Sequence, residues 1–105
     1  MSDISVIDAA TFDYEVVNYS GSVVVDFFAT WCGPCKSLST VLEKMVPELP
    51  PNTKIVKVDI DDHPMLATEY NVKSLPTIVV FRDGKVTATA VGLQSKEKIL
   101  KLLSQ

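Results

Sequence analysis

The sequence is poor in the residues that build metal sites and disulfide frameworks. Its 105 residues include two cysteines and one histidine. A structural zinc site normally needs four cysteine or histidine ligands, so zinc would require two chains to share the metal. The acidic residues Asp59, Asp61 and Asp62 do not complete a cation site, because neighbours on a strand point to opposite faces of a sheet. We therefore expect no bound metal.

Long basic runs and long apolar runs are missing as well. The formal net charge is −3, and interspersed signs leave no basic stretch for nucleic acid or an anionic membrane. The longest apolar run, residues 23–29, is interrupted by Asp26 and is far shorter than the roughly 20 residues that span a bilayer. Residues 1–7 lack the basic and apolar regions of a secretory signal. We expect a cytoplasmic protein; a secreted domain that has lost its signal is the alternative, and Met1 argues against it.

The length and composition are typical of one globular domain. The chain is 47% hydrophobic and 22% charged, and a chain of this length buries about two-thirds of the surface of its unfolded form. We therefore expect residues 1–105 to form a single domain.

Changes in the periodicity of apolar residues predict the element order β-α-β-α-β-α-β-β-α. The run at 23–29 is typical of a strand buried on both faces, and a helical pattern follows from Pro34 to Val46, where Pro47 should end or kink the helix. The other predicted elements are strands at 5–7, 55–60, 77–81 and 85–91 and helices at 10–18, at 64–70 and from Ser95 onward. Asp83-Gly84 predicts an antiparallel turn between the last two strands. This order predicts an α/β fold with a central mixed sheet of five strands flanked by four helices.

The two cysteines lie where the central strand ends and the long helix begins. Free backbone amides at a helix N-terminus carry partial positive charge, which favours the thiolate of Cys32 over its thiol. A free cysteine is about 3% ionised at pH 7, and a pKa lowered to about 7 would make it half ionised. Cys35, one turn into the helix, should be more buried and remain a thiol until a mixed disulfide forms. The pair predicts a dithiol–disulfide oxidoreductase in which an exposed Cys32 attacks and Cys35 resolves the intermediate.

The active-site segment of the thioredoxin family resembles one stretch of this chain, Val25-Asp26-Phe27-Phe28-Ala29-Thr30-Trp31-Cys32-Gly33-Pro34-Cys35-Lys36. Four other segments fit the family pattern, so that the resemblance spans essentially the whole chain: Lys57-Val58-Asp59, Leu75-Pro76-Thr77, Phe81 with Asp83-Gly84-Lys85, and Val91-Gly92. The resemblance implies the thioredoxin fold and a monomeric protein-disulfide reductase that carries electrons without a bound cofactor. It implies disulfide-containing proteins as substrates, and as partner a thioredoxin reductase that is either an NADPH-dependent flavoenzyme or ferredoxin-linked.

The resemblance further assigns Asp26 and Lys57 to proton transfer. Burial of Asp26 in an apolar strand should raise the pKa of its carboxyl, because a charged carboxylate loses hydration there. The resemblance then makes Asp26 the proton acceptor and donor for Cys35, through water, with Lys57 as the neighbouring charge. The alternative is a structural carboxylate that is satisfied by hydrogen bonds.

A substrate-binding surface around Cys32 is also implied by the resemblance. The Leu75-Pro76 bond would be cis, with Pro76 facing the disulfide and the Leu75 backbone bonding an extended substrate segment. The flat apolar surface would comprise Trp31, Gly33, Pro34, Leu75, Gly92 and Leu93. Three departures from the family pattern bear on the choice of partner, namely Thr40 in place of a proline, Phe28 in place of a tryptophan, and the bulky Leu93.

Other uses of the same fold remain open. A non-catalytic interaction subunit would bind partners through the apolar surface and would not need the cysteines. A disulfide-forming oxidant would run the same chemistry in reverse, although Gly33-Pro34 resembles the reducing type. A purely structural Cys32–Cys35 disulfide closes so small a ring that it would stabilise the fold by only about 2 kcal/mol.

Overall fold

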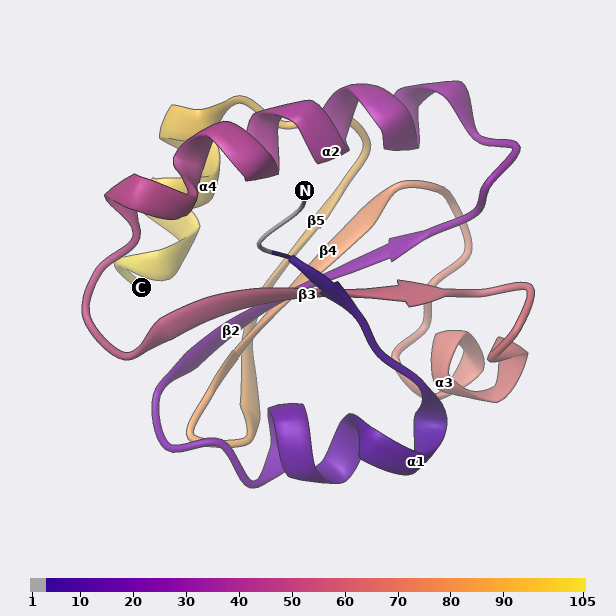
Figure 1. The fold of residues 1–105 in the computed structure, drawn as a ribbon, viewed down its shortest axis with the longest axis horizontal. Coiled ribbons are helices and arrows are strands. Elements are labelled where there is room, and N and C mark those ends of the chain that lie inside the picture. The colour runs from indigo at the N-terminus through magenta and orange to yellow at the C-terminus, as the bar shows by residue number, and fades with distance from the viewer. Residues whose placement is uncertain (1–3) are drawn as a thin grey trace.

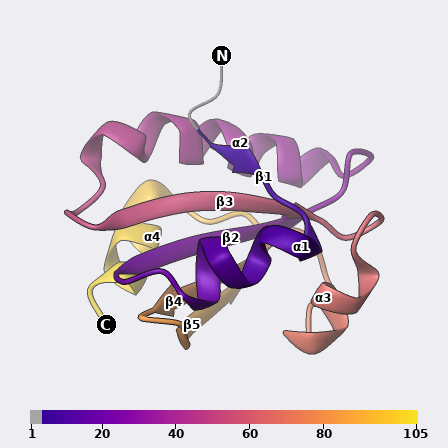
Figure 2. The same ribbon diagram turned by 60° about the horizontal axis from the view of Figure 1, so that its bottom comes forward.

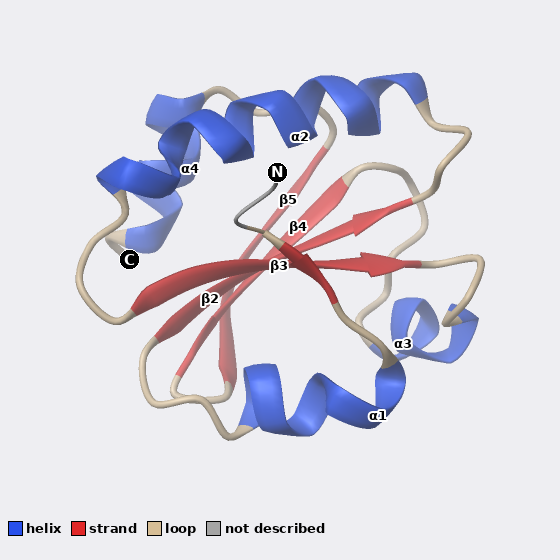
Figure 3. Ribbon diagram, viewed as in Figure 1, coloured by secondary structure: helices blue, strands red, loops and turns tan. Residues whose placement is uncertain are grey.

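A five-stranded sheet with helices on both faces organises the computed structural model, which describes residues 4–105 (Figure 1, Figure 3). The strands are β1 (Ser5–Val6), β2 (Ser22–Phe28), β3 (Thr53–Asp59), β4 (Thr77–Arg82) and β5 (Lys85–Val91). The α-helices of the described residues are α1 (Ala9–Phe12), α2 (Gly33–Met45), α3 (Pro64–Glu69) and α4 (Lys96–Leu103). The predicted α/β fold is confirmed. Residues 1–3, part of the segment expected to lack a secretory signal, lie outside the described residues.

Strand β2 lies in the middle of the sheet, as the sequence predicts. The strand order is β1-β3-β2-β4-β5, with β1 and β2 parallel to β3. Strand β4 is antiparallel to both β2 and β5, so the sheet is mixed. Residues 23–27 are all buried, because β2 has a neighbouring strand on each side and helices over each face.

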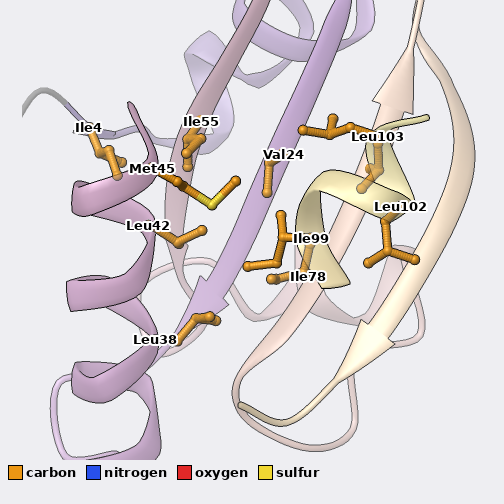
Figure 4. Packing of buried hydrophobic residues seen from close by; sticks show 11 residues of the cluster. Ile4, Val24, Leu38, Leu42, Met45, Ile55, Ile78, Ile99, Leu102 and Leu103 are labelled. Carbon is orange, nitrogen blue, oxygen red and sulfur yellow. The ribbon is translucent and has the colours of Figure 1, made fainter. Parts of the chain in front are cut away.

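The alternation of side chains along the strands divides the core into two layers. On one face, Val24 and Ile55 pack against Leu42 of α2 and Ile99 of α4 (Figure 4). On the opposite face, Val23, Val25 and Phe27 pack against residues of α1 and α3, which Figure 2 shows on the other side of the sheet from α2. Since side chains alternate with a period of two, Asp26 and Lys57 share the face of Val24 and Ile55 and point toward α2.

The first helix and the third strand differ from their predicted bounds. Helix α1 is followed by a wider π-helical turn, Asp13–Val17, in which the Asn18 amide donates to the Asp13 carbonyl oxygen at 2.8 Å. Strand β3 begins at Thr53 and not at residue 55, because pairing with β2 recruits two polar residues that carry no apolar signal.

Helix α2 ends near Val46, as the position of Pro47 predicts. It stops at Met45 and continues as a short 3-10 turn, Val46–Glu48, which contains Pro47. Thr40 stands inside the α-helix and its hydroxyl donates to the Lys36 carbonyl oxygen at 3.3 Å. The α2 segment that lies over the active site is therefore continuous, and the irregularity falls beyond its far end.

Candidate active site

Strand β2 and helix α2 together position the two cysteines. The chain leaves the carboxyl end of β2 and turns back into α2 (Figure 1). Cys32 is the N-cap residue of α2, and Cys35 lies in its first turn. Pro34 occupies the start of the helix, where its missing amide hydrogen costs no hydrogen bond. The backbone amide of Cys35 donates to the Cys32 sulfur at 3.1 Å. One of the free amides of the helix terminus therefore points at the Cys32 sulfur.

The two sulfurs form a disulfide with a Cα–Cα distance of 5.3 Å. Cys35 is 3% exposed, and Cys32 is only 5% exposed. The prediction that Cys32 is exposed is therefore wrong for the disulfide form. Ala29 packs with both cysteines, and the partly buried side chains of Phe28, Ile60 and Leu75 complete this cluster.

A groove of about 400 Å³ gives access to Cys32. It is lined by Trp31, Cys32, Gly33, Pro34, Ile60, Val72, Lys73, Ser74 and Leu75. Four residues of the predicted apolar surface therefore meet here, and the Trp31 side chain is 69% exposed. The sequence did not identify Ile60 or residues 72–74, because they come from distant segments that only the fold brings to Cys32.

The loop before β4 contributes Ser74 and Leu75 to the lining of the groove. The Leu75-Pro76 bond is cis, as predicted. The Gly92 amide donates to the Pro76 carbonyl oxygen at 2.8 Å, and Gly92 has φ +89°, a conformation that strains residues with a side chain. Leu93 is 54% exposed, and neither it nor Gly92 lines the groove. The place of these two residues in the substrate-binding surface and the contact of Pro76 with the disulfide stay predictions.

Asp61 holds the exposed tryptophan, a role that the sequence did not reveal. The indole Nε1 of Trp31 donates to Asp61 Oδ2 at 2.8 Å. The sequence raised Asp61 only as part of a possible cation site, and residues 4–105 contain no group of three or more potential ligands that could hold a metal. The contact arises because β2 and β3 are parallel, and parallel strands end at the same edge of a sheet.

Replacing Asp61 by alanine is expected to raise KM for a protein disulfide about threefold and to leave kcat nearly unchanged, because a lost hydrogen bond frees the Trp31 ring without touching the sulfurs. Steady-state kinetics check this, and the emission of the single tryptophan reports whether the ring is released. The matched control is Asp62→Ala, which removes an exposed carboxylate that lines a different pocket near α3. A lowered kcat with unchanged KM would contradict the positioning role.

Asp26 is fully buried beneath α2. Its exposed fraction is 0%, and neither carboxyl oxygen has a hydrogen-bond partner within the described part of the chain. Burial raises the pKa of this carboxyl from 3.8 to about 7, and the charge of Lys57 opposes that rise. The predicted direction of the pKa is confirmed. A structural carboxylate satisfied by protein hydrogen bonds does not describe Asp26.

Lys57 lies opposite Asp26 in the register of β2 and β3. Its ammonium donates to the Ser39 hydroxyl oxygen at 3.0 Å and lies 4.5 Å from the centroid of the Phe28 ring. A second groove of about 450 Å³ is lined by Phe28, Ala29, Thr30, Cys35, Lys36, Ser39, Thr40, Glu43 and Lys57. The two grooves share no residue, so each cysteine of the disulfide lines its own groove.

Comparisons with known proteins settle the family. The thioredoxin family model matches residues 3–105. The chain belongs to the thioredoxin family. A thioredoxin of Chlamydia trachomatis is 52% identical over 86 residues, which cover 82% of this chain and 83% of that protein. A thioredoxin of Staphylococcus aureus is 40% identical over 105 residues, which cover 100% of this chain and 98% of the relative.

A solved structure agrees with the family assignment. A mutant thioredoxin of Halobacterium salinarum matches with a TM-score of 0.85 at 33% identity, and the match covers 96% of this chain and 87% of that one. The thioredoxin fold is thus confirmed. None of the helices within residues 4–105 has both the length and the apolar character that crossing a membrane requires.

The family and the redox pair together define the activity. The chain is a thioredoxin-type thiol–disulfide oxidoreductase that reduces protein disulfides through Cys32 and Cys35. A non-catalytic interaction subunit is not favoured. The substrates are disulfide-containing proteins, and membership in the thioredoxin family implies a thioredoxin reductase as a partner.

Proposed function

We propose that Cys32 is the attacking nucleophile of this reductase and that Cys35 is the resolving thiol. The observation that carries the proposal is the Cys35 amide that donates to the Cys32 sulfur at the N-terminus of α2. In the reduced protein, this amide and the positive end of the helix would stabilise a thiolate at position 32. Cys35 lies inside the first turn and is buried, so it is suited to remain a thiol.

The exchange proceeds in two steps. The Cys32 thiolate attacks one sulfur of a substrate disulfide, and the other substrate sulfur leaves as a thiolate that takes up a proton. Cys35 then gives its proton to Asp26 and attacks the Cys32 sulfur. The Cys32–Cys35 bond forms, the second substrate sulfur leaves and is protonated, and two electrons have passed to the substrate. A reductase returns two electrons and restores both thiols.

Asp26 serves as the proton acceptor and donor for Cys35 in this proposal. Its pKa of about 7 supports the role, because a base with a pKa close to the working pH is ionised often enough to accept a proton and basic enough to hold it. Lys57 supplies the neighbouring positive charge. Cys35 and Lys57 both line the second groove. In this proposal, water in that groove connects Cys35 and Lys57 with the solvent.

Substrate binding uses the surface beside Cys32. An extended substrate segment would lie along the first groove and pair with the backbone of Leu75, as an added strand pairs with a sheet edge. The residues proposed for this surface are Trp31, Gly33, Pro34, Leu75, Pro76, Gly92 and Leu93. The broad exposure of Trp31 supports docking of large partners with little selectivity for side chains.

The cellular setting is part of the same proposal. We infer that residues 1–105 act as one domain and as a monomer in the cytoplasm. The recharging partner is a thioredoxin reductase, either an NADPH-dependent flavoenzyme or a ferredoxin-linked enzyme.

Trapping of substrates tests the assignment of the two cysteines. Reduced Cys35→Ser protein is expected to accumulate a stable mixed disulfide with a disulfide-bonded protein such as insulin, because nothing then attacks the Cys32 sulfur. Non-reducing gels and mass spectrometry measure the adduct, with Cys32→Ser as the matched variant that should form none. Equal adduct on both variants, or more on Cys32→Ser, would reverse the roles or reject them.

A further inference from the structure

The Lys57 side chain is held from two directions in the groove beside Cys35. Its ammonium donates to the Ser39 hydroxyl oxygen at 3.0 Å, and the Phe28 ring lies 4.5 Å away. We propose that Ser39 is a positioning residue that keeps the Lys57 ammonium beside Asp26, so that the charge of Lys57 acts on the acid–base step at Cys35. This inference rests on the proposed function of Asp26.

Helix α2 places the Ser39 hydroxyl on the same side of the helix as Cys35. The two residues are four positions apart, which is about one helical turn, and both line the second groove. Leu38 and Leu42 point into the core from the same helix, so Ser39 lies at the border between the packed face and the groove. It is partly buried, where a hydroxyl can reach an ammonium that comes from the sheet.

The Phe28 ring does not replace the hydroxyl. An ammonium has three hydrogens to donate, and a phenyl ring offers it attraction without a lone pair. Within residues 4–105, the Ser39 oxygen is the hydrogen-bond acceptor found for Lys57. Because the groove opens to solvent, a lysine that loses this acceptor gains more from hydration by moving outward than from staying over the ring.

Other charges surround the same position and are left in place by a change at Ser39. Lys36 and Glu43 line the groove from α2, Asp26 is the residue of β2 in register with Lys57, and Asp59 lies two residues beyond Lys57 on β3. Replacement of Ser39 alone therefore alters the position of one ammonium against a constant background of charge.

The direction of the effect follows from the sign of the lysine. A nearby positive charge favours the carboxylate of Asp26 over its neutral form, so Asp26 ionises at a lower pH when Lys57 is held in place. Release of Lys57 then leaves fewer carboxylates to take the Cys35 proton below neutral pH. At high pH the carboxylate is formed in either case, and the loss disappears.

The test is the pH profile of single-turnover reduction of insulin by the reduced protein. Asp26 is mostly protonated at pH 6, so its ionised fraction falls in proportion to its ionisation constant when Lys57 is released. We therefore expect Ser39→Ala to lower the rate about twofold at pH 6. At pH 9 its rate should equal that of the parent. Carbon-13 NMR of the Asp26 carboxyl in the reduced protein should show the titration midpoint move to higher pH. Alanine is the best helix former, so the variant should fold.

Three variants make the result decisive. Ser37→Ala removes a hydroxyl from the exposed side of α2 and should keep the parent profile, while Ser39→Thr should restore it by restoring the acceptor. A rate loss that is equal at pH 6 and pH 9, or an unchanged profile and midpoint in Ser39→Ala, overturns the positioning role. Asp26→Asn separates the two proposals. If it changes the profile and Ser39→Ala does not, only the positioning role fails, and if it too leaves the profile unchanged, both fail.

Discussion

Replacement of Cys32 by serine is expected to reduce insulin-reduction turnover with dithiothreitol by at least about a thousandfold, to the rate of dithiothreitol alone, because no covalent intermediate can form without the first sulfur. A serine hydroxyl stays protonated at neutral pH and does not attack a disulfide. The positive helix terminus therefore has no thiol at position 32 whose ionisation it could favour. The fold should persist, since Ala29, Ile60 and Leu75 still pack around the smaller side chain.

The same assay separates the reductase from a protein that acts only by binding. Circular dichroism of Cys32→Ser serves as the control for folding. The variant keeps Trp31 and the groove beside it, so it should still compete weakly with the parent for substrate. A Cys32→Ser protein as active as the parent would contradict the enzymatic mechanism and favour the interaction subunit.

Replacement of Asp26 by asparagine is expected to stabilise the protein at pH 8 by up to about 4 kcal/mol, the cost of burying a carboxylate whose pKa rises from 3.8 to about 7 on folding. Between pH 3.8 and about pH 7, the Asp26 carboxyl holds a proton in the folded chain that it has lost in the unfolded chain. The free energy of unfolding of the parent therefore falls as the pH rises through this window. Asparagine carries no charge, so the variant lacks this fall and the advantage should nearly vanish at pH 4.

Urea unfolding of the oxidised protein at pH 4 and pH 8 measures this difference. The matched control is Asp62→Asn, which neutralises an exposed carboxylate and should change stability little at either pH. Turnover of Asp26→Asn at pH 7 should fall at least about tenfold, because the variant lacks the general base that we propose for Cys35. Greater stability at pH 8 with full turnover from pH 6 to pH 9 would leave Asp26 as a buried charge without a catalytic role.

The parts of the site that could be predicted are those with a local signal. The buried run of β2, the proline at the start of α2 and the two cysteines between them are consecutive in the chain, so the sequence alone places Cys32 at a helix terminus. The interruption of that run by Asp26 likewise predicts a buried carboxyl with a raised pKa. Burial and helix-terminus electrostatics follow directly from such neighbours.

The parts that could not be predicted depend on segments that are distant in sequence. Asp61 meets Trp31 because β3 ends beside β2, and Ser39 meets Lys57 because α2 packs on the face of the sheet that carries Lys57. The low exposure of Cys32 results from packing against Ile60 and Leu75, one after β3 and the other before β4. None of these contacts leaves a pattern in the local sequence.

The sequence by itself determined the chemistry of this protein. Short stretches of neighbouring residues predict the redox pair at a strand-to-helix junction, the buried acid, and the order of strands and helices. Only the tertiary structure decided which surfaces give access to the disulfide and which charges lie near it. It divides the surroundings of the disulfide into a groove beside Cys32 and a groove beside Cys35. The physical reason is that helix and strand periodicity acts over a few residues, whereas access, packing and the placement of a charge depend on which elements lie next to one another.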